Sequence, residues 1–136
     1  MPTYNGAAYL PEQLESIAAQ TRLLDELVVC EDRSTDGRTR EIVEAFAPKS
    51  PFQVRLSVNR KTQGSRTNFE QAIRRCAADI IFLCDQDDVW NQTKLARIEE
   101  TFLSAPEIGA PSRGSFAAGC SQYLRAPQKD RGAMVH

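Results

Sequence analysis

The sequence predicts an α/β fold in which a mostly parallel sheet is flanked by helices. Helical and strand-like patterns alternate along residues 1–108, as they do in layered α/β domains. Two of the apolar, strand-like runs lead directly into acidic loops. Ligands of such folds bind beyond the carboxyl ends of the strands, so these loops are the first candidates for a site.

The first half of the chain predicts two helices and two strands. Apolar residues at helical spacing predict a helix over residues 11–20, and Pro11 suits its first turn. The β-branched run at residues 27–29 predicts a buried strand. Helical spacing returns around residues 42–46, and the strict alternation of apolar and polar residues over 52–58 predicts a half-exposed strand.

The second half predicts a helix, a strand and a last helix. Residues 69–77 carry the clearest helical pattern, with Thr67 or Asn68 as its cap. The continuously apolar residues 80–84 predict a central parallel strand covered on both faces. From Gly109 onward neither pattern persists, so we expect one domain over residues 1–108 and a poorly ordered tail over 109–136. The apolar face of the last helix is predicted to consist of Leu95, Ile98, Phe102 and Leu103.

Composition excludes several classes of function. A chain of 136 residues with a formal net charge of -1 has no overall field to attract nucleic acid or anionic lipid. No apolar run approaches the roughly 20 residues that span a bilayer, so we expect a cytoplasmic protein whose membrane contact is peripheral at most. The single histidine, His136, is terminal, and the four cysteines are widely spaced. This pattern disfavours a zinc site and a Ser-His-Asp triad, and it predicts reduced, packed thiols.

Asp85, Asp87 and Asp88 place three carboxylates in one short turn after an apolar strand. Mg²⁺ or Mn²⁺ could relieve their mutual repulsion and bind a diphosphate at the same time. Alternatively, Asp88 or Asn91 caps the following helix and the other carboxylates are solvated.

Two further groups are candidate binding residues. Glu31 and Asp32 end another predicted strand, where a carboxylate could accept hydrogen bonds from a base or a ribose. An acidic pair there could equally form part of a turn. Tyr4 offers an aromatic face on which a base could stack, although the surrounding residues also suit a turn with a packed tyrosine.

Taken in order, these motifs resemble glycosyltransferase family 2 of the GT-A fold, over about residues 1–108. The resemblance implies an inverting enzyme that transfers a sugar from a nucleoside-diphosphate sugar to a hydroxyl of a saccharide or lipid-linked acceptor, in cell-surface polysaccharide synthesis. The acidic motif, with Asn68-Phe69 before it, looks most like bacterial rhamnosyltransferases, which implies a dTDP-linked donor. The motifs are Thr3-Tyr4-Asn5-Gly6, Glu31-Asp32-Arg33-Ser34-Thr35-Asp36-Gly37, Asn68-Phe69 and Asp85-Gln86-Asp87-Asp88-Val89-Trp90.

The resemblance also implies roles for individual residues. Tyr4 and Asp32 match positions that contact the nucleotide base, and Thr3 joins them among the donor-binding residues. Asp85 and Asp87 match the acidic motif that holds the ribose and the metal-bound diphosphate. Asp87 and Asp88 are the expected ligands of Mg²⁺ or Mn²⁺.

The sequence departs from the family in three places. Arg33 stands where the family often has glycine or another small residue, and a buried first strand usually precedes the point at which this chain begins. Nothing after Gly109 matches the catalytic carboxylate base, so no catalytic residue is assigned, and we expect an amino-terminal fragment that is inactive alone. Two alternatives remain: a non-catalytic fragment that binds a nucleotide poorly or not at all, and a phosphate-handling hydrolase that uses Asp85 and a nearby lysine.

Overall fold

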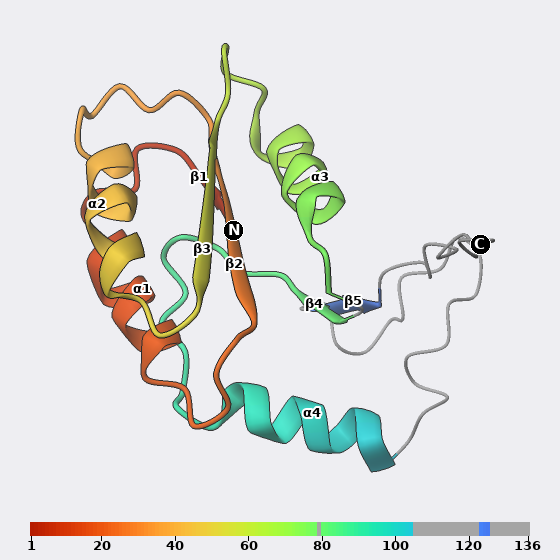
Figure 1. Cartoon of the computed structure of the whole chain (residues 1–136). Coiled ribbons are helices and arrows are strands. Elements are labelled where there is room, and N and C mark those ends of the chain that lie inside the picture. Colours follow the sequence, from red (N-terminus) through yellow and green to blue (C-terminus); the bar gives the residue numbers. More distant parts are fainter. Residues whose placement is uncertain (79, 105–122, 126–136) are drawn as a thin grey trace, which may run out of the picture.

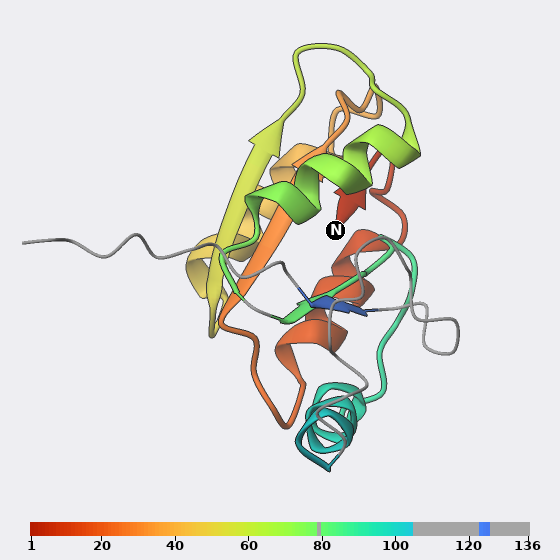
Figure 2. The same ribbon diagram turned by 90° about the vertical axis from the view of Figure 1, so that its right-hand side faces the viewer.

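The computed structural model describes residues 1–78, 80–104 and 123–125. Its centre is a three-stranded parallel sheet in the order β1-β2-β3, with two helices, α1 and α2, on one face and α3 on the other (Figures 1 and 2). This arrangement confirms the α/β class predicted from the sequence. The elements are β1 (Pro2–Thr3), α1 (Leu10–Ala18), β2 (Glu26–Glu31), α2 (Thr39–Phe46), the 3-10 turn η1 (Ala47–Lys49), β3 (Gln53–Val58), α3 (Ser65–Arg75), β4 (Ile80–Phe82), α4 (Lys94–Ser104) and β5 (Tyr123–Arg125).

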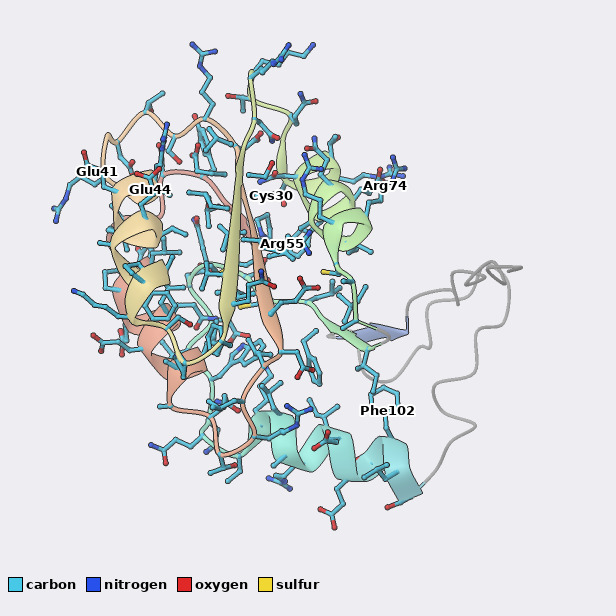
Figure 3. All side chains as sticks on the ribbon, viewed as in Figure 1. Cys30, Glu41, Glu44, Arg55, Arg74 and Phe102 are labelled. Atoms are coloured by element: carbon cyan, nitrogen blue, oxygen red, sulfur yellow. The ribbon has the colours of Figure 1, made fainter. Side chains whose placement is uncertain are left out.

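β2 is buried along almost its whole length because helices cover both of its faces. Leu27 and Val29 belong to the main core, which includes apolar side chains of α1 and α2. Val28 and Cys30 point the other way and pack against α3. Figure 3 shows Cys30 on this side of the sheet. A strand buried on both faces needs apolar residues in succession, which explains the unbroken run in the sequence.

The register of the sheet brings three strand ends to one edge. Thr3 of β1 pairs with Glu31 of β2, and Glu31 pairs with Val58 of β3. Because all three strands are parallel, the loops that follow them leave from the same edge. This edge is where the predicted binding residues Thr3, Tyr4 and Asp32 lie.

The predicted central strand over residues 80–84 is wrong. β4 covers only Ile80–Phe82, lies outside the parallel sheet and pairs antiparallel with β5. The reason lies in β1, which spans two residues, one of them a proline without an N–H donor, and so offers little backbone for a further partner. β4 finds its hydrogen bonds in Tyr123–Arg125 instead. The remainder of the predicted tail, 109–122 and 126–136, lies outside the described residues.

Two helix predictions also need correction. α3 begins at Ser65, so Thr67 and Asn68 lie inside it and are not caps. Gly64, with φ +83°, occupies the position before the helix, where a side chain would be strained. In α4, Leu95 is buried as predicted, but Leu103 is 78% exposed because the helix extends away from the sheet (Figure 1).

A cavity of about 300 Å³ lies among the first half of β2, β4 and α4. Its lining is mostly apolar and includes Leu27, Ile81 and Leu95, but none of the predicted site residues. Within the described ranges, none of the helices has the length and apolar character that crossing a bilayer requires.

Candidate functional site

The candidate site lies where β1 and β2 end. The N–H of Asp32 donates to the carbonyl of Thr3 at 2.8 Å, which places the two residues side by side. Thr3 is 1% exposed, and its Oγ1 is the one buried side-chain oxygen in the described part of the chain without a hydrogen-bond partner. Tyr4 is 45% exposed. A buried oxygen without a partner beside an open aromatic ring is a feature that a ligand could use.

The turn after β1 is attached to the loop after β2 by side-chain hydrogen bonds. Asn5 adopts φ +48°, and its Oδ1 accepts hydrogen bonds from the N–H groups of Thr35 at 2.8 Å and Asp36 at 3.2 Å. The N–H of Gly6 donates to Thr39 Oγ1 at 2.8 Å. The local turn predicted around Tyr4 therefore depends on a second loop for its shape.

The carboxylate of Asp36 accepts hydrogen bonds from Thr39 at the start of α2. Its Oδ1 accepts from the N–H of Thr39 at 3.0 Å, and its Oδ2 accepts from Thr39 Oγ1 at 2.6 Å. Desolvation acts to raise the pKa of Asp36, but the hydrogen bonds from Thr39 and from nearby backbone N–H groups outweigh it and lower the pKa from 3.8 to about 2. The carboxylate therefore stays charged and anchors the helix start.

Asp32 is buried, and the loop that follows β3 supplies three hydrogen-bond donors to its carboxylate. Oδ1 accepts from Asn59 Nδ2 at 2.7 Å and from the N–H of Gln63 at 2.8 Å, and Oδ2 accepts from the N–H of Gly64 at 2.8 Å. The structure therefore gives Asp32 a clear local role, which is to hold residues 59–64 against the sheet edge. A base could reach this carboxylate only alongside or in place of these donors.

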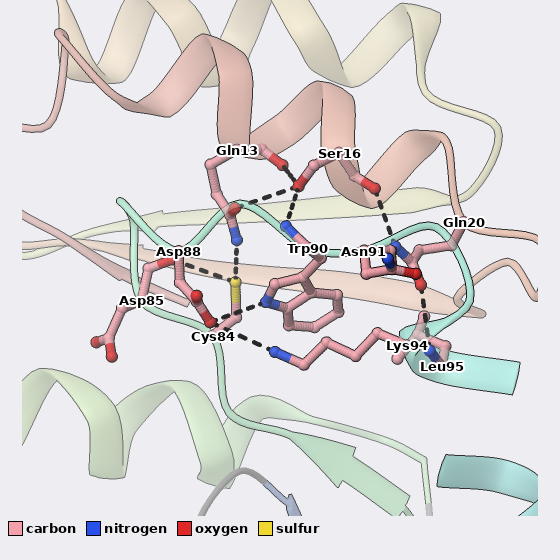
Figure 4. Close-up of polar contacts among 10 residues, drawn as sticks. All are labelled: Gln13, Ser16, Gln20, Cys84, Asp85, Asp88, Trp90, Asn91, Lys94 and Leu95. Atoms are coloured by element: carbon pink, nitrogen blue, oxygen red, sulfur yellow. Dashed lines mark hydrogen bonds and ion pairs between the residues drawn. The ribbon is translucent and has the colours of Figure 1, made fainter. Parts of the chain in front are cut away.

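Asp85 and Asp87 differ from Asp88 in their surroundings. Asp85 and Asp87 are exposed, and their carboxylates have no hydrogen-bond or ion-pair partner among the described residues. Asp88 Oδ2 accepts from Trp90 Nε1 at 3.2 Å and faces Lys94 Nζ at 3.4 Å (Figure 4). Lys94 also lies over the Trp90 ring, 4.3 Å from its centroid. One oxygen of Asp88 thus has a structural partner, whereas the other two carboxylates remain open.

α1 holds the acidic turn in place through its polar residues. The N–H of Trp90 donates to Ser16 Oγ at 2.9 Å, and Gln13 Nε2 donates to Cys84 Sγ at 2.7 Å (Figure 4). Burial raises the pKa of the Cys84 thiol to about 11, so it remains a neutral partner for Gln13. These contacts lie on both sides of Asp85–Asp88 and fix where the turn begins and ends.

Gln20, two residues beyond the end of α1, continues this attachment into α4. Gln20 Nε2 donates to the carbonyl of Asn91 at 2.7 Å, and Gln20 Oε1 accepts from the N–H of Leu95 at 3.1 Å. The sequence contained one signal for these roles, since Gln13 and Gln20 are uncharged polar residues that flank the apolar face of a helix. Periodicity alone could not say what they bind.

The two acidic loops are linked through a side chain and not through adjacent strands. The strands that precede them, β2 and β4, are not neighbours in one sheet. Gln86 bridges the gap, because its Oε1 accepts from the N–H of Tyr4 at 2.9 Å and its Nε2 donates to the carbonyl of Tyr4 at 3.0 Å. Thr3, Tyr4, Asp32 and the acidic turn therefore form one continuous region, with β1 in the middle.

The acidic turn suits a hard divalent cation that shares its coordination with a ligand. No three His, Cys, Asp or Glu side chains converge as a complete metal site in the part of the chain that the structure describes. Mg²⁺ in nucleotide sites, however, takes only one or two carboxylates and completes its shell with phosphate oxygens and water. The open carboxylates of Asp85 and Asp87 and the second oxygen of Asp88 fit that requirement.

Comparison with known proteins places this arrangement in a family. Residues 1–129 match the family described as glycosyl transferase family 2. The matched range extends beyond residue 108 and includes β5. The dTDP-rhamnosyl transferase RfbG of Shigella flexneri is 36% identical over 100 residues, which are 70% of this chain and 34% of RfbG. The chain thus spans about a third of the length of this relative.

Two solved structures share the fold. The mannosyltransferase PcManGT of Pyrobaculum calidifontis, in complex with GDP-Man and Mn²⁺, superposes with a TM-score of 0.71 and 30% identity over 79% of this chain and 32% of that one. Residues 1–349 of Staphylococcus aureus TarS, in complex with UDP, give a TM-score of 0.70 and 28% identity over 77% of this chain and 31% of that one. Family match, curated relative and shared GT-A architecture agree, and the chain belongs to glycosyl transferase family 2.

Proposed function

We propose that this chain forms the donor-binding part of an inverting glycosyltransferase that transfers a sugar from a nucleoside diphosphate to a hydroxyl of a saccharide or lipid-linked acceptor. The observation that carries the proposal is the continuity of the region from Asp32 through Thr3 and Tyr4 to Asp85–Asp88. It joins an exposed aromatic ring, a buried hydroxyl without a partner and two open carboxylates. A base can stack on the ring, a polar group of the nucleoside can pair with the hydroxyl, and the carboxylates can hold a cation that binds the diphosphate.

Each predicted residue has a role that its surroundings support. Tyr4 stacks on the base, and Thr3 Oγ1 pairs with a polar group of the nucleoside. Asp32 contributes mainly by placing the 59–64 loop beside the base. Asp85 accepts a hydrogen bond from the ribose, and Asp87 lies next to the diphosphate.

Asp87 and Asp88 would hold Mg²⁺ or Mn²⁺, with Asp88 using the oxygen that does not face Lys94. When bound, the cation supplies positive charge that stabilises the departing nucleoside diphosphate. The ion pair with Lys94 and the hydrogen bond from Trp90 hold the Asp88 carboxylate in one orientation. The relative PcManGT was solved with Mn²⁺ and GDP-Man, which supports the choice of metal class.

The donor that we propose is a dTDP-linked sugar, specifically rhamnose, for the synthesis of a cell-surface polysaccharide. The support is the similarity to RfbG and the form of the acidic motif in this sequence. Competition between dTDP, UDP and GDP in one binding assay tests the choice of base directly.

The hydrolase alternative requires a lysine near the acidic turn, and Lys94 is the nearest candidate. Its side chain is 17% exposed, lies over Trp90 and pairs with Asp88. Lys94 is therefore occupied by the fold itself and does not favour phosphate hydrolysis. Release of phosphate from an aryl phosphate would support that alternative against the glycosyltransferase proposal.

Calorimetry with dTDP or UDP in the presence of Mn²⁺ tests the proposed function. We expect measurable binding by the wild type and a large loss for Asp87→Ala, with Asp25→Ala as a matched surface control. Circular dichroism should show that all three proteins are folded. Equal and negligible heats for the folded wild type and Asp87→Ala would contradict the proposal.

A further inference from the structure

Gln86 makes a paired contact with Tyr4 that the proposed roles do not explain. Its amide accepts from the Tyr4 N–H at 2.9 Å and donates to the Tyr4 carbonyl at 3.0 Å. Only a side-chain amide can satisfy both backbone groups in this way, because a carboxylate would place a second acceptor against the carbonyl. The neighbouring residues Asp85 and Asp87 could not replace it.

The surroundings of Gly6 show how closely the turn after β1 approaches the side chain of Gln86. A Cβ on Gly6 would lie 2.8 Å from Cδ of Gln86 and closer still to its Oε1. The left-handed backbone that often requires glycine is found at Gly37 and Gly64 but not at Gly6, where the atoms nearest to an added Cβ all belong to the Gln86 amide. The Tyr4–Gly6 turn and the Gln86 amide therefore fit together as one packed unit.

This unit has a consequence for ligand binding. Tyr4 lies at the proposed base position, and Asp85 and Asp87 flank Gln86 at the proposed diphosphate position. A rigid link between them sets the separation of the two half-sites before a ligand arrives, which lowers the cost of binding both ends of one molecule.

We propose that Gln86 is a positioning residue that couples binding of the nucleoside to binding of the metal and diphosphate. This inference rests on the proposed donor-binding function. Gln86 contacts neither base nor metal in this scheme, and it acts through the backbone of Tyr4. Without the link, each half-site keeps its own chemistry, but the cation strengthens nucleotide binding less.

The test measures how much Mn²⁺ tightens the binding of dTDP and UDP to the full chain. Gln86→Met keeps the length of the side chain and removes both hydrogen bonds, and Gln92→Met is the matched control at an exposed position. For the wild type and Gln92→Met we expect the same enhancement by Mn²⁺. For Gln86→Met we expect an enhancement roughly tenfold smaller, the factor that loss of about one or two net hydrogen bonds would produce. Binding without Mn²⁺ should change much less.

A double-mutant cycle on thermal stability provides a second measurement that needs no ligand. Gly6→Ala should lower Tm in the wild-type background and have little effect in the Gln86→Ala background, where the space is open. Equal effects in both backgrounds would overturn the packed unit.

The binding outcomes separate this inference from the proposed function. If the wild type binds and Gln86→Met retains the full Mn²⁺ enhancement, the coupling role is wrong and donor binding stands. If the folded wild type binds neither nucleotide with or without Mn²⁺, the proposed function fails and this inference fails with it.

Discussion

Asn59 donates a hydrogen bond to the buried carboxylate of Asp32 at 2.7 Å, and this contact joins the end of β2 to the loop that follows β3. The same carboxylate accepts from the N–H groups of Gln63 and Gly64, directly before α3 begins. One side chain at a strand end therefore shapes the loop and the start of a helix, in addition to the binding role that the family resemblance implies.

Replacing Asp32 should destabilise the protein strongly. Asp32→Ala removes the acceptor of three donors at a site that is 2% exposed, and we expect a loss of about 3 kcal/mol in the free energy of unfolding. Asp25→Ala, at a side chain that is 81% exposed, should change it by about 0.5 kcal/mol or less. Urea denaturation followed by circular dichroism measures both, and equal midpoints for the two variants would contradict this role.

Asp36 should make stability fall in acid. Its pKa is about 2 in the folded protein and 3.8 in the unfolded chain, so the unfolded chain binds a proton first as the pH falls. The stabilisation is complete above pH 4 and is lost as the pH falls from about 4 through 2. Thermal melts between pH 2 and 5 should show a shallower decline for Asp36→Asn than for Asp25→Asn, and parallel curves would show that Asp36 does not contribute.

Substitutions of Arg33 should measure how much its left-handed backbone conformation lowers the free energy of unfolding. It adopts φ +58°, a region that disfavours residues with a Cβ by about 1–2 kcal/mol, and β-branched residues most of all. Arg33→Gly relieves this cost, although it loses the hydrogen bond from Arg33 Nη1 to the carbonyl of Arg60. We expect glycine to be the most stable and valine the least stable at this position in urea unfolding.

Arg38 provides the control for that series, since it is exposed and its φ of -122° lies outside the left-handed region. Arg38→Val should therefore cost much less than Arg33→Val. Similar losses at the two positions would mean that side-chain contacts, and not the left-handed backbone, decide stability at Arg33.

The thiols should differ in their reactivity with iodoacetamide. Cys84 is 3% exposed with a pKa of about 11, and Cys30 is fully buried, whereas Cys76 is half-buried. Because the thiolate is the reactive form, we expect Cys76 to be modified before Cys30 and Cys84, the other two cysteines in the described part of the chain, which should react only after unfolding in urea. Peptide mass spectrometry measures the order. Modification of Cys84 as fast as Cys76 in the native protein would show that the Gln13–Cys84 contact opens freely.

The sequence was sufficient to predict local features of the fold. The spacing of Leu10, Leu14 and Ile17 predicts α1, and the apolar run at residues 27–29 predicts β2, because periodicity reports which face of an element is buried. The acidic residues after the strands and the aromatic turn identified the candidate site and the family. These features depend on neighbours in the chain, so the sequence alone determined them.

Only the tertiary structure decided which segments hydrogen-bond to each other. The apolar residues 80–82 would suit either the parallel sheet or a separate strand pair, and they pair with β5. Asn68 lies inside α3, because the loop before this helix ends at Gly64, whose N–H donates to Asp32. Gln86 reaches Tyr4 across 82 positions of the chain. A hydrogen bond needs a donor and an acceptor at the right distance and angle. The pattern of apolar and polar residues along the sequence does not indicate where a distant partner will lie.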